Sequence, residues 1–576
     1  AERHGVTPEH IALSSGSSGV LTYIATAAGA KGNVLAPDLF WDTTLEMGTR
    51  HGGEIVRLPK TASLAIDLDA MERPVRELVD DTLRAVSIGF SYLDGADSLA
   101  AYVEAREPEI AYQRLLYERL GDLYLEQERY QDAAETYEAF VNQDPYHPKA
   151  PVLQVQVIES YKQGGFPSLV LEGKKRFAER YGMDGPFWVR NPREENEAVA
   201  EHLKSNLTDL AQYYHAEAQR DGKKSDYQQA ANWYRKYLDY FPGEADTANT
   251  NFLLAEILYE SEEYGAAVSE YERTAYGYPF HEKSAEAGYA AILAYREHEK
   301  LLSGAEQAEW HQAYLDSGLR FADTYPEHPE SGAVLTTVAE DLFQQNRFDL
   351  AIAVGQSVVG KQPPVKPELA RTAWTVIAHS QFDLANYSDA ENAYYSLRNF
   401  TPADDAVANQ EIKDRIASTI YKQGEMARDA GDLETAVTHF RRLGQAVPDS
   451  AIRATAEYDA AAALINLQAW DRASVVLEEF RRDYPDSEFA DDVTQKLAVT
   501  YLESGQAGQA AAEFERIADS DSSTDDVRRE ALWKASELYE QTGALTAEQR
   551  VLNNIIGRYP NPISESIEAR ARLLDI

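Results

Sequence analysis

The sequence predicts a mostly α-helical chain of stacked helical hairpins, forming a right-handed α–α superhelix with a small α/β segment at its N-terminal end. Three observations lead to this fold class. From about residue 75 onward, apolar residues recur with the period of helices, and strand-like alternation is almost absent. A pattern of small, aromatic and proline residues returns along this region every 37 to 39 residues in most places. In residues 1–74, segments with the alternation of strands and segments with the period of helices follow one another.

The first 74 residues carry the α/β pattern. Strand-like segments are "HIALSS", "GNVLAP" and "GEIVRLP", and the helix-like "WDTTLEMGTRHG" lies before the last of these. Gly and Pro separate the segments, which is typical of βαβ units with a parallel sheet. We expect a truncated α/β segment over 1–74 and a helical lead-in over 75–112.

The repeat is clearest between residues 114 and 147. Large, small and proline residues hold positions 4, 7, 8, 11, 20, 24, 27 and 32 of a 34-residue unit: Tyr117, Leu120, Gly121, Tyr124, Ala133, Tyr137, Phe140 and Pro145. Small residues at 8 and 20 allow two antiparallel helices to approach closely, and proline at 32 ends the second helix. We expect about eleven such hairpins over 113–562, with insertions near 181–205, 296–312 and 402–415, and the start of a further helix over 563–576.

These offsets resemble the tetratricopeptide repeat at every signature position. The resemblance implies a non-catalytic scaffold that binds proteins, with the first helix of each hairpin lining a concave groove. At the groove positions of that family the sequence has carboxylates and aromatic side chains, which would suit a basic and apolar peptide or protein. The implied groove residues are Glu118, Asp122, Glu126, Phe252, Glu256, Tyr259, Glu260, Glu340, Phe343, His379, Phe382, Tyr421, Glu425, Arg428, Asp429, Tyr458 and Asn466.

Composition restricts the classes of partner. Acidic residues outnumber basic ones 96 to 55, for a net charge of -41. This balance argues against nucleic acid, because phosphate binding needs a basic face. The charge serves either solubility, including in a salt-rich habitat, or the attraction of basic partners. There is no cysteine, which excludes disulfides and thiolate metal sites, and no apolar run is long enough to span a membrane.

Catalytic and metal-binding motifs are not evident in the repeat region. One string, "DSDSSTDDVRRE", places Asp519, Asp521, Ser523 and Glu530 at calcium-loop positions, but Thr524 stands where that loop needs glycine. The same residues also suit an acidic loop that caps the next helix. We therefore expect no metal site.

A second resemblance covers the segment 1–74, in its residues 3–72. The order of strand, "SSGSSG" loop, helix and "GNVLAP" is similar to the early large domain of fold-type I pyridoxal-phosphate aminotransferases, nearest to the histidinol-phosphate branch. The resemblance implies that Gly16, Ser17 and Ser18 would hold the cofactor phosphate and that Trp41 would stack on the pyridine ring. The pattern ends near Met71, before the family's Schiff-base lysine, so we expect neither cofactor nor catalysis.

Two interpretations of this segment remain. It is a fused or misassembled remnant, or it belongs to an aminotransferase that another chain completes, with pyridoxal phosphate as cofactor and the repeats as a regulatory or tethering region.

The helical sequence pattern of the repeat region also resembles that of long bacterial repeat proteins of the cell envelope, so we expect a periplasmic or envelope location, with the cytoplasm as the alternative. Both ends look like cuts, which predicts a piece of a longer protein.

Overall fold

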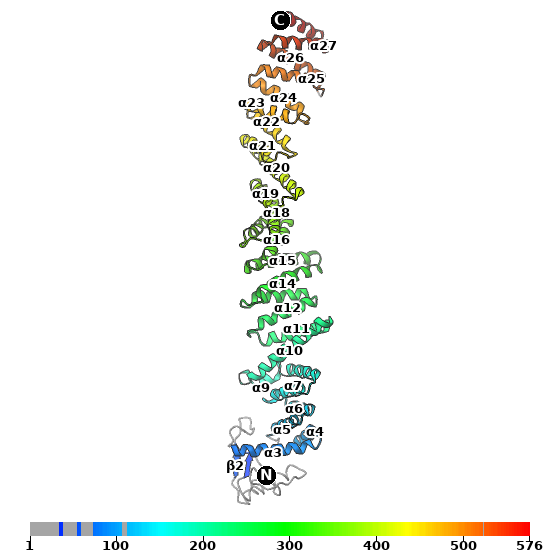
Figure 1. The fold of residues 1–576 in the computed structure, drawn as a ribbon, viewed down its shortest axis with the longest axis vertical. Coiled ribbons are helices and arrows are strands. Elements are labelled where there is room, and N and C mark those ends of the chain that lie inside the picture. Colours follow the sequence, from blue (N-terminus) through cyan, green and yellow to red (C-terminus); the bar gives the residue numbers. More distant parts are fainter. Residues whose placement is uncertain (1–33, 38–54, 59–72, 106–111, 522) are drawn as a thin grey trace. The chain divides into compact units, whose positions relative to one another are not determined.

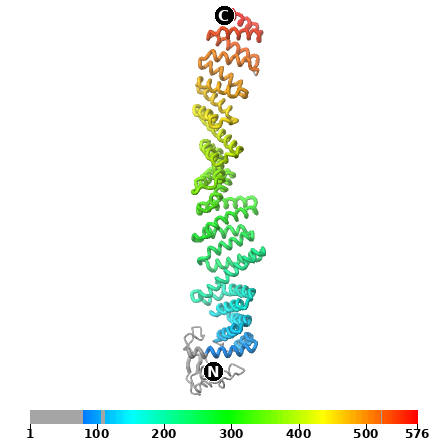
Figure 2. The backbone as a smooth tube through the Cα atoms, in the orientation of Figure 1, coloured from blue at the N-terminus to red at the C-terminus, as the bar shows by residue number. Residues whose placement is uncertain are grey.

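The computed structural model describes residues 34–37, 55–58, 73–105, 112–521 and 523–576. Within each compact unit, helices follow one another as antiparallel hairpins stacked in sequence order (Figures 1 and 2). This arrangement confirms the predicted mostly α-helical repeat. The chain divides into two compact units, one ending at Leu302 and the other beginning at Ser303.

The described part of the N-terminal segment is a pair of short strands. β1 (Val34–Pro37) and β2 (Ile55–Leu58) pair in parallel, with Val34 opposite Ile55. Both coincide with segments for which the sequence predicts strands. The other elements expected in this segment lie outside the described residues.

The first unit continues with helices α3 to α14. Most are amphipathic helices of about four turns that bury one face against the preceding helix and the other against the next. Their bounds are α3 (Arg73–Ser91), α4 (Ala96–Glu104), α5 (Gln113–Glu126), α6 (Tyr130–Gln143), α7 (Ala150–Gln163), α8 (Pro167–Arg180), α9 (Pro186–Arg190), α10 (Glu197–Asp221), α11 (Lys224–Tyr240), α12 (Thr247–Glu260), α13 (Tyr264–Glu272) and α14 (Ser284–Glu299). Two further helical turns are η3 (Arg193–Glu195) and η4 (Arg273–Gly277).

The second unit contains helices α15 to α28. It is the more regular unit, because nearly every helix from α16 to α27 belongs to a hairpin with the spacing of the repeat. The bounds are α15 (Gly304–Thr324), α16 (Ser331–Gln344), α17 (Phe348–Val359), α18 (Pro367–Asp383), α19 (Tyr387–Phe400), α20 (Ala406–Asp429), α21 (Leu433–Ala446), α22 (Arg453–Asn466), α23 (Trp470–Asp483), α24 (Ala490–Glu503), α25 (Ala507–Asp519), α26 (Asp525–Thr542), α27 (Leu545–Arg558) and α28 (Ile563–Asp575).

The stretches expected as insertions differ in structure. Residues 181–205 contain the short helix α9, the turn η3 and the start of α10. Residues 296–312 contain the end of α14 and the start of α15. In the third stretch, residues 402–415, the chain enters α20, whose 24 residues make it longer than the first helices of neighbouring hairpins.

Small residues form the seam between the two helices of a hairpin. In eight hairpins, positions 8 and 20 are both Gly or Ala, and the alanines have no solvent exposure. A Cβ atom on Gly121 would lie 2.3 Å from the ring of Tyr137, so only glycine allows this approach. The pairs are Gly121 and Ala133, Ala218 and Ala230, Ala255 and Ala267, Ala339 and Ala351, Ala378 and Ala390, Gly424 and Ala436, Ala461 and Ala473, and Ala498 and Ala510.

A left-handed residue sets the turn inside each hairpin. In ten hairpins the second residue before the second helix has a positive φ, whichever amino acid stands there. These residues are Glu128, Gly165, Gly222, Glu262, Asn346, Ala385, Gly431, Gln468, Gly505 and Gly543. A constant turn fixes the register of the two helices, which is why the seam positions keep their spacing.

At the start of several first helices, a side chain accepts a hydrogen bond from a nearby backbone N–H. Nδ1 of His147, His281 and His328, each two residues after a proline, accepts the backbone N–H two residues further on, at 3.0 to 3.2 Å. In a later repeat the hydroxyl of Ser487 accepts the N–H of Phe489 in the same way. These contacts satisfy backbone groups where the chain leaves one hairpin and enters the next.

Candidate functional site

The groove residues implied by the sequence all lie on first helices of hairpins. In the first unit they belong to α5 and α12, and in the second to α16, α18, α20 and α22. Their spacing of three or four residues places them along one side of each helix. Exposure varies within the set, since Phe252 is buried, whereas Asp122, Glu126, Glu340 and Asn466 are exposed.

In the first unit the carboxylates of this set on α5 have side-chain partners within the chain. On α5, Asp122 accepts the hydroxyl of Tyr137 at 2.8 Å, and Glu118 pairs with Arg114. Glu126 pairs with Arg84 of α3 at 3.2 Å. Asp122 and Glu126 therefore connect neighbouring helices, whereas the ion pair of Glu118 lies within α5.

The carboxylates of α12 show the same arrangement. Glu256 accepts the hydroxyl of Tyr271, and burial raises the pKa of Glu256. Glu260 accepts the side-chain amide of Gln219 at 2.9 Å, which connects α12 to α10. The ring of Tyr259 contacts the ring of Tyr264, with centroids 5.2 Å apart.

On α20, charges of both signs balance one another. Glu425 lies 2.7 Å from Lys422 and 3.6 Å from Arg428, and Arg428 also contacts Asp429 and Asp459. Lys422 and Arg428 therefore neutralise the charge of Glu425 in this part of the predicted surface. This part is less acidic than its carboxylates alone suggest.

Two tyrosines of the set link consecutive first helices. Tyr421 of α20 donates its hydroxyl to Asp459 of α22 at 2.6 Å, and Tyr458 of α22 donates to Asp492 of α24. Tyr458 also stacks on Phe489, with centroids 4.4 Å apart and an interplanar angle of 17°. These tyrosines stabilise the stacking of repeats while each leaves part of its ring accessible.

The surface of α16 and α18 differs from the rest. The rings of Phe343 and His379 lie 6.0 Å apart on these two packed helices, and Phe382 contacts Tyr387 at 5.4 Å. Phe343, His379 and Phe382 are half-buried, so each presents part of its ring to solvent. Phe343 and His379 thus bring aromatic side chains of two consecutive first helices next to each other.

Three carboxylates around this aromatic row form no ion pair among the described residues. Glu340 of α16, Asp383 of α18 and Glu411 of α20 are exposed, and Arg415 of α20 is the cation nearby. Partial desolvation by the surrounding side chains and the charge of the neighbouring Asp341 raise the pKa of Glu340. Burial, followed by Arg415, lowers the pKa of His379, which keeps that ring uncharged near neutral pH. The row Phe343, His379 and Phe382 with Glu340, Asp383 and Glu411 is called the aromatic–acidic surface below.

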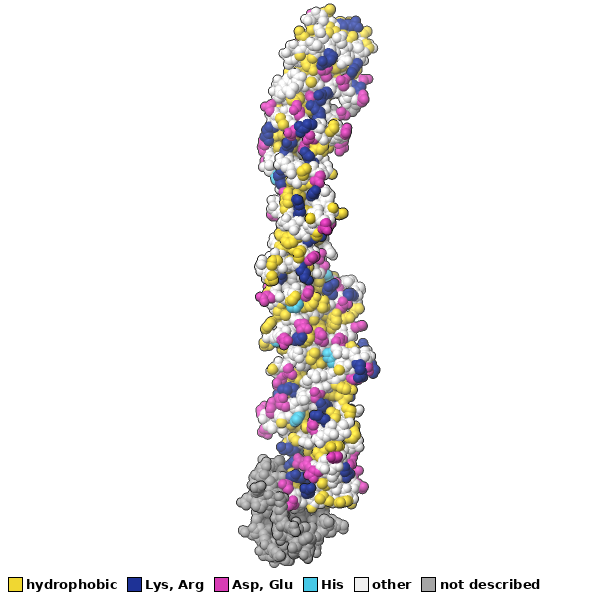
Figure 3. Space-filling model, viewed as in Figure 1, with side chains coloured by type: hydrophobic (Ala, Val, Ile, Leu, Met, Phe, Trp, Pro, Cys, Tyr) yellow, Lys and Arg dark blue, Asp and Glu magenta, His cyan; other side chains and the backbone are white. Residues whose placement is uncertain are grey.

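Ion pairs between repeats account for many of the remaining acids. On second helices an Arg of one repeat contacts a Glu or Asp of the repeat before or after it, as in Arg441–Glu479, Arg472–Glu434, Arg481–Glu513 and Arg550–Glu515, each at 2.7 Å. Figure 3 shows acidic and basic side chains interspersed on the visible face over these helices. Sequence reasoning misses this network, although Arg and Glu recur about one repeat apart.

The remaining predicted site residues can be placed only in part. Gly16, Ser17, Ser18 and Trp41 lie outside the described residues. In the calcium-like string, the hydroxyl of Thr524 accepts the N–H of Val527 at 3.4 Å and caps α26. Within the described ranges, no three His, Asp or Glu side chains are grouped to hold a metal ion, and no helix is long and apolar enough to cross a membrane.

Comparison with known proteins identifies the type of repeat. Sequence models of the tetratricopeptide repeat match residues 92–148 and 215–282, and a second model of this repeat matches 418–450 and 455–487. These matches support the predicted repeat type in both units. Tetratricopeptide repeats bind proteins and are typically non-catalytic, so the matches support a scaffold for protein–protein interaction. No curated protein matches the sequence.

Several solved structures are similar at low identity. The tetratricopeptide repeat domain of P58(IPK) has 13% identity and a TM-score of 0.20, covering 74% of this chain and 99% of that one. A tetratricopeptide repeat protein from Parabacteroides merdae has 13% identity and a TM-score of 0.20, covering 50% and 98%. Yeast Tom70 has 12% identity and a TM-score of 0.20, covering 83% and 99%.

Proposed function

We propose that this protein is a scaffold that binds a protein partner through the aromatic–acidic surface of the second unit. The observation that carries the proposal is the contrast within the predicted groove. In the first unit the predicted carboxylates have hydrogen-bond or ion-pair partners, as Glu425 of α20 also has. By contrast, the predicted residue Glu340 and its neighbours Asp383 and Glu411 are exposed without an ion-pair partner among the described residues.

The surface favours a partner segment with basic and apolar side chains. Half-buried rings supply contact area at little cost in side-chain entropy, and exposed carboxylates orient and attract lysine or arginine. Three carboxylates against the single cation Arg415 leave this surface negative at neutral pH. The overall charge of -41 would speed the approach of such a partner.

The proposal is tested by panning a random peptide library against the purified chain and measuring the affinity of enriched peptides by fluorescence anisotropy. We expect peptides rich in Lys or Arg beside aromatic or aliphatic residues. Glu340→Lys and Phe382→Ala should each weaken binding by about tenfold or more. Glu488→Lys makes the same charge change at an exposed loop position outside this surface, and it should have little effect.

Two results would contradict the proposal. One is enrichment of acidic peptides, and the other is equal weakening by Glu488→Lys and Glu340→Lys. Added salt should also weaken binding to the unaltered chain more than binding to Glu340→Lys, because exposed charge pairs are screened.

We also propose a periplasmic or cell-envelope location. This proposal rests on the resemblance of the helical sequence pattern to that of long bacterial repeat proteins of the cell envelope. Fractionation of the native host, with detection by an antibody against the repeats, tests this location. Recovery in the cytoplasmic fraction alone would refute it.

A further inference from the structure

One hairpin departs from the seam pattern of the others. In α7 and α8, the two positions that are Gly or Ala in eight hairpins are Ile158 and Val170. A third change accompanies them, because Lys174 stands at position 24, where most hairpins have a large apolar or aromatic residue. The hairpin therefore has bulky residues at both aligned seam positions and lacks the ring that normally covers the seam. The small residue that packs on Ile158 is Gly173 instead, where a Cβ atom would lie 3.0 Å from that side chain.

The regular hairpins show what that ring does. In α5 and α6, Tyr137 lies against Gly121 and donates its hydroxyl to Asp122, which is next to the seam glycine. In α12 and α13, Tyr271 likewise donates to Glu256, which is next to the seam residue Ala255. The residue at position 24 thus spans the seam, and its phenol reaches the carboxylate at position 9.

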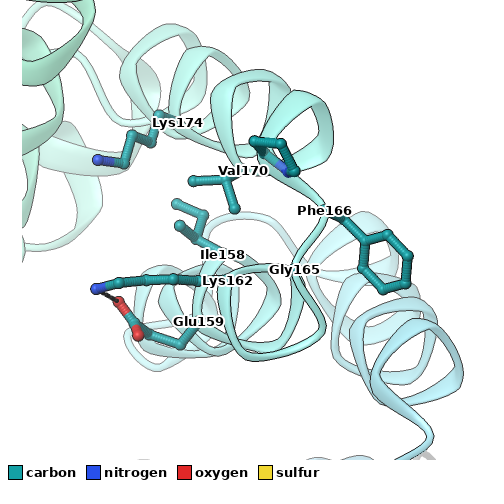
Figure 4. Close-up of a pocket in the computed structure, with 8 residues that line it drawn as sticks. Ile158, Glu159, Lys162, Gly165, Phe166, Val170 and Lys174 are labelled. Carbon is teal, nitrogen blue, oxygen red and sulfur yellow. Dashed lines mark hydrogen bonds and ion pairs between the residues drawn. The ribbon is translucent and has the colours of Figure 1, made fainter.

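The altered hairpin has a hollow at this place (Figure 4). Its volume is about 310 Å³. Ile158 and Val170 point toward one another between the helices, and Lys162 and Lys174 extend on the same side of the hollow. The remaining lining residues are Glu159, Gly165, Phe166 and Pro167.

Glu159 occupies position 9, where Asp122 and Glu256 accept a tyrosine hydroxyl in their hairpins. Its only described side-chain partner is Lys162, at 3.5 Å. The amine of Lys174 is held by Asp209 of α10, which draws this side chain away from Glu159. The hollow therefore has apolar walls and an accepting carboxylate but no aromatic ring of its own hairpin.

A second hairpin also lacks a large residue at position 24, and it shows why the hollow is specific to α7 and α8. Gly355 of α17 stands at that position, but a Cβ atom there would lie 2.9 Å from Ile377 of the next helix. The neighbouring repeat fills that seam. In α7 and α8 the corresponding space is open.

We propose that the hollow between α7 and α8 binds a tyrosine side chain of a partner protein, with the ring on Ile158 and Val170 and the hydroxyl donating to Glu159. The partner thereby supplies the ring that the hairpin lacks. An acidic residue beside that tyrosine would meet Lys162, whose side chain is 67% exposed. The inference shares with the proposed function only the class of partner, a protein, and it concerns a different unit.

The test uses 4-fluorophenol as a probe of the phenol site, with fluorobenzene as the probe that lacks the hydroxyl, and detects binding to the full chain by ¹⁹F NMR line broadening. We expect saturable binding of 4-fluorophenol that is at least about threefold tighter than that of fluorobenzene, because only the phenol donates to Glu159. Glu159→Leu should remove this preference.

Lys174→Tyr is the decisive variant, because it restores the ring found in the regular hairpins and fills the hollow. It should abolish binding of 4-fluorophenol while retaining the helical circular dichroism of the chain. Lys224→Tyr, which makes the same exchange at an exposed position at the start of α11, should bind like the unaltered chain.

Unchanged binding in Lys174→Tyr would overturn the proposal, and so would equal affinity for the two probes. Self-association of the chain that is lost in Lys174→Tyr and in Tyr92→Ala would also overturn it, since the exposed Tyr92 of a second copy would then be the occupant. The variants Glu340→Lys and Phe382→Ala leave this hollow intact, so failure of the aromatic–acidic surface would not affect the result.

Discussion

Glu548 is expected to weaken the last complete hairpin, α26 and α27. It stands at seam position 20, where eight other hairpins have alanine, and only 2% of its surface is exposed. No described side chain donates a hydrogen bond to its carboxylate. Burial and the charge of Glu540 raise the pKa of Glu548, and Arg572 opposes them. The side chain is thus covered in the seam, where its carboxylate has Glu540 as a like charge and Arg572 as the opposing one.

The magnitude is set at the low end of the cost of an unsatisfied polar group, about 1 kcal/mol, because the carboxylate is only partly desolvated. A carboxyl group whose folded-state pKa lies above its ordinary value of 4.5 binds more protons when folded. Its stabilising contribution is therefore present at low pH and is lost as the pH rises through the raised value. At pH 7, Glu548→Gln should stabilise the hairpin, and this gain should shrink toward pH 4.

Hydrogen exchange of the α27 amides is the suitable assay, because repeat proteins open locally and a single global midpoint would average over the chain. A gain of about 1 kcal/mol would slow exchange roughly fivefold at pH 7. Glu548→Ala tests the seam directly, since it restores the residue of the other hairpins. Glu530→Gln, at an exposed position of α26, is the control. Exchange in Glu548→Gln that is unchanged at pH 7, or faster, would refute the reasoning.

Three further predictions concern the seam, the buried charges and the cofactor. Gly121→Ala should lower the free energy of unfolding of its hairpin by about 1–3 kcal/mol, because the new Cβ atom would lie 2.3 Å from the ring of Tyr137. Gly557→Ala is the control: no atom lies within 4 Å of its new Cβ atom, so it should be neutral or stabilising in the same denaturation assay. Arg442 donates to both oxygens of Glu391 at 2.7 and 2.8 Å, so Arg442→Met should destabilise α19–α21 by about 3 kcal/mol, and the double variant with Glu391→Leu should recover part of this loss. Mixing the chain with pyridoxal phosphate should give no aldimine absorbance band, and a band that borohydride fixes to the chain would show that our expectation of no cofactor is wrong.

The placement of the predicted groove residues shows how far sequence reasoning extends. The repeat pattern predicts that Asp122 and Glu340 both lie on first helices, and they do. It cannot show that Tyr137 donates to Asp122 while Glu340 has no such partner, because both acids follow the same helical period. Their difference depends on which side chain the adjacent helix brings to each position.

The seam exceptions lead to a similar conclusion. Ile158, Val170 and Glu548 are visible in the sequence as departures from Gly or Ala once the repeats are aligned. Only the packed hairpins show that the first two border a hollow and that the third is a buried carboxylate. The space left by a smaller residue can be filled by a side chain of the neighbouring repeat, as Ile377 fills the space beside Gly355. The sequence does not reveal which side chain does so.

The sequence by itself determined the helical hairpin, its period and the seam, because these depend on local spacing: small residues at fixed positions, a turn of constant length and proline after the second helix. The tertiary structure decided which charges remain available to a partner. Pairing of side chains depends on distances between helices that are a full repeat apart in the chain, as in the contacts of Tyr421 with Asp459 and of Arg472 with Glu434. Those distances are set by the stacking of hairpins, which the period of a single hairpin does not specify.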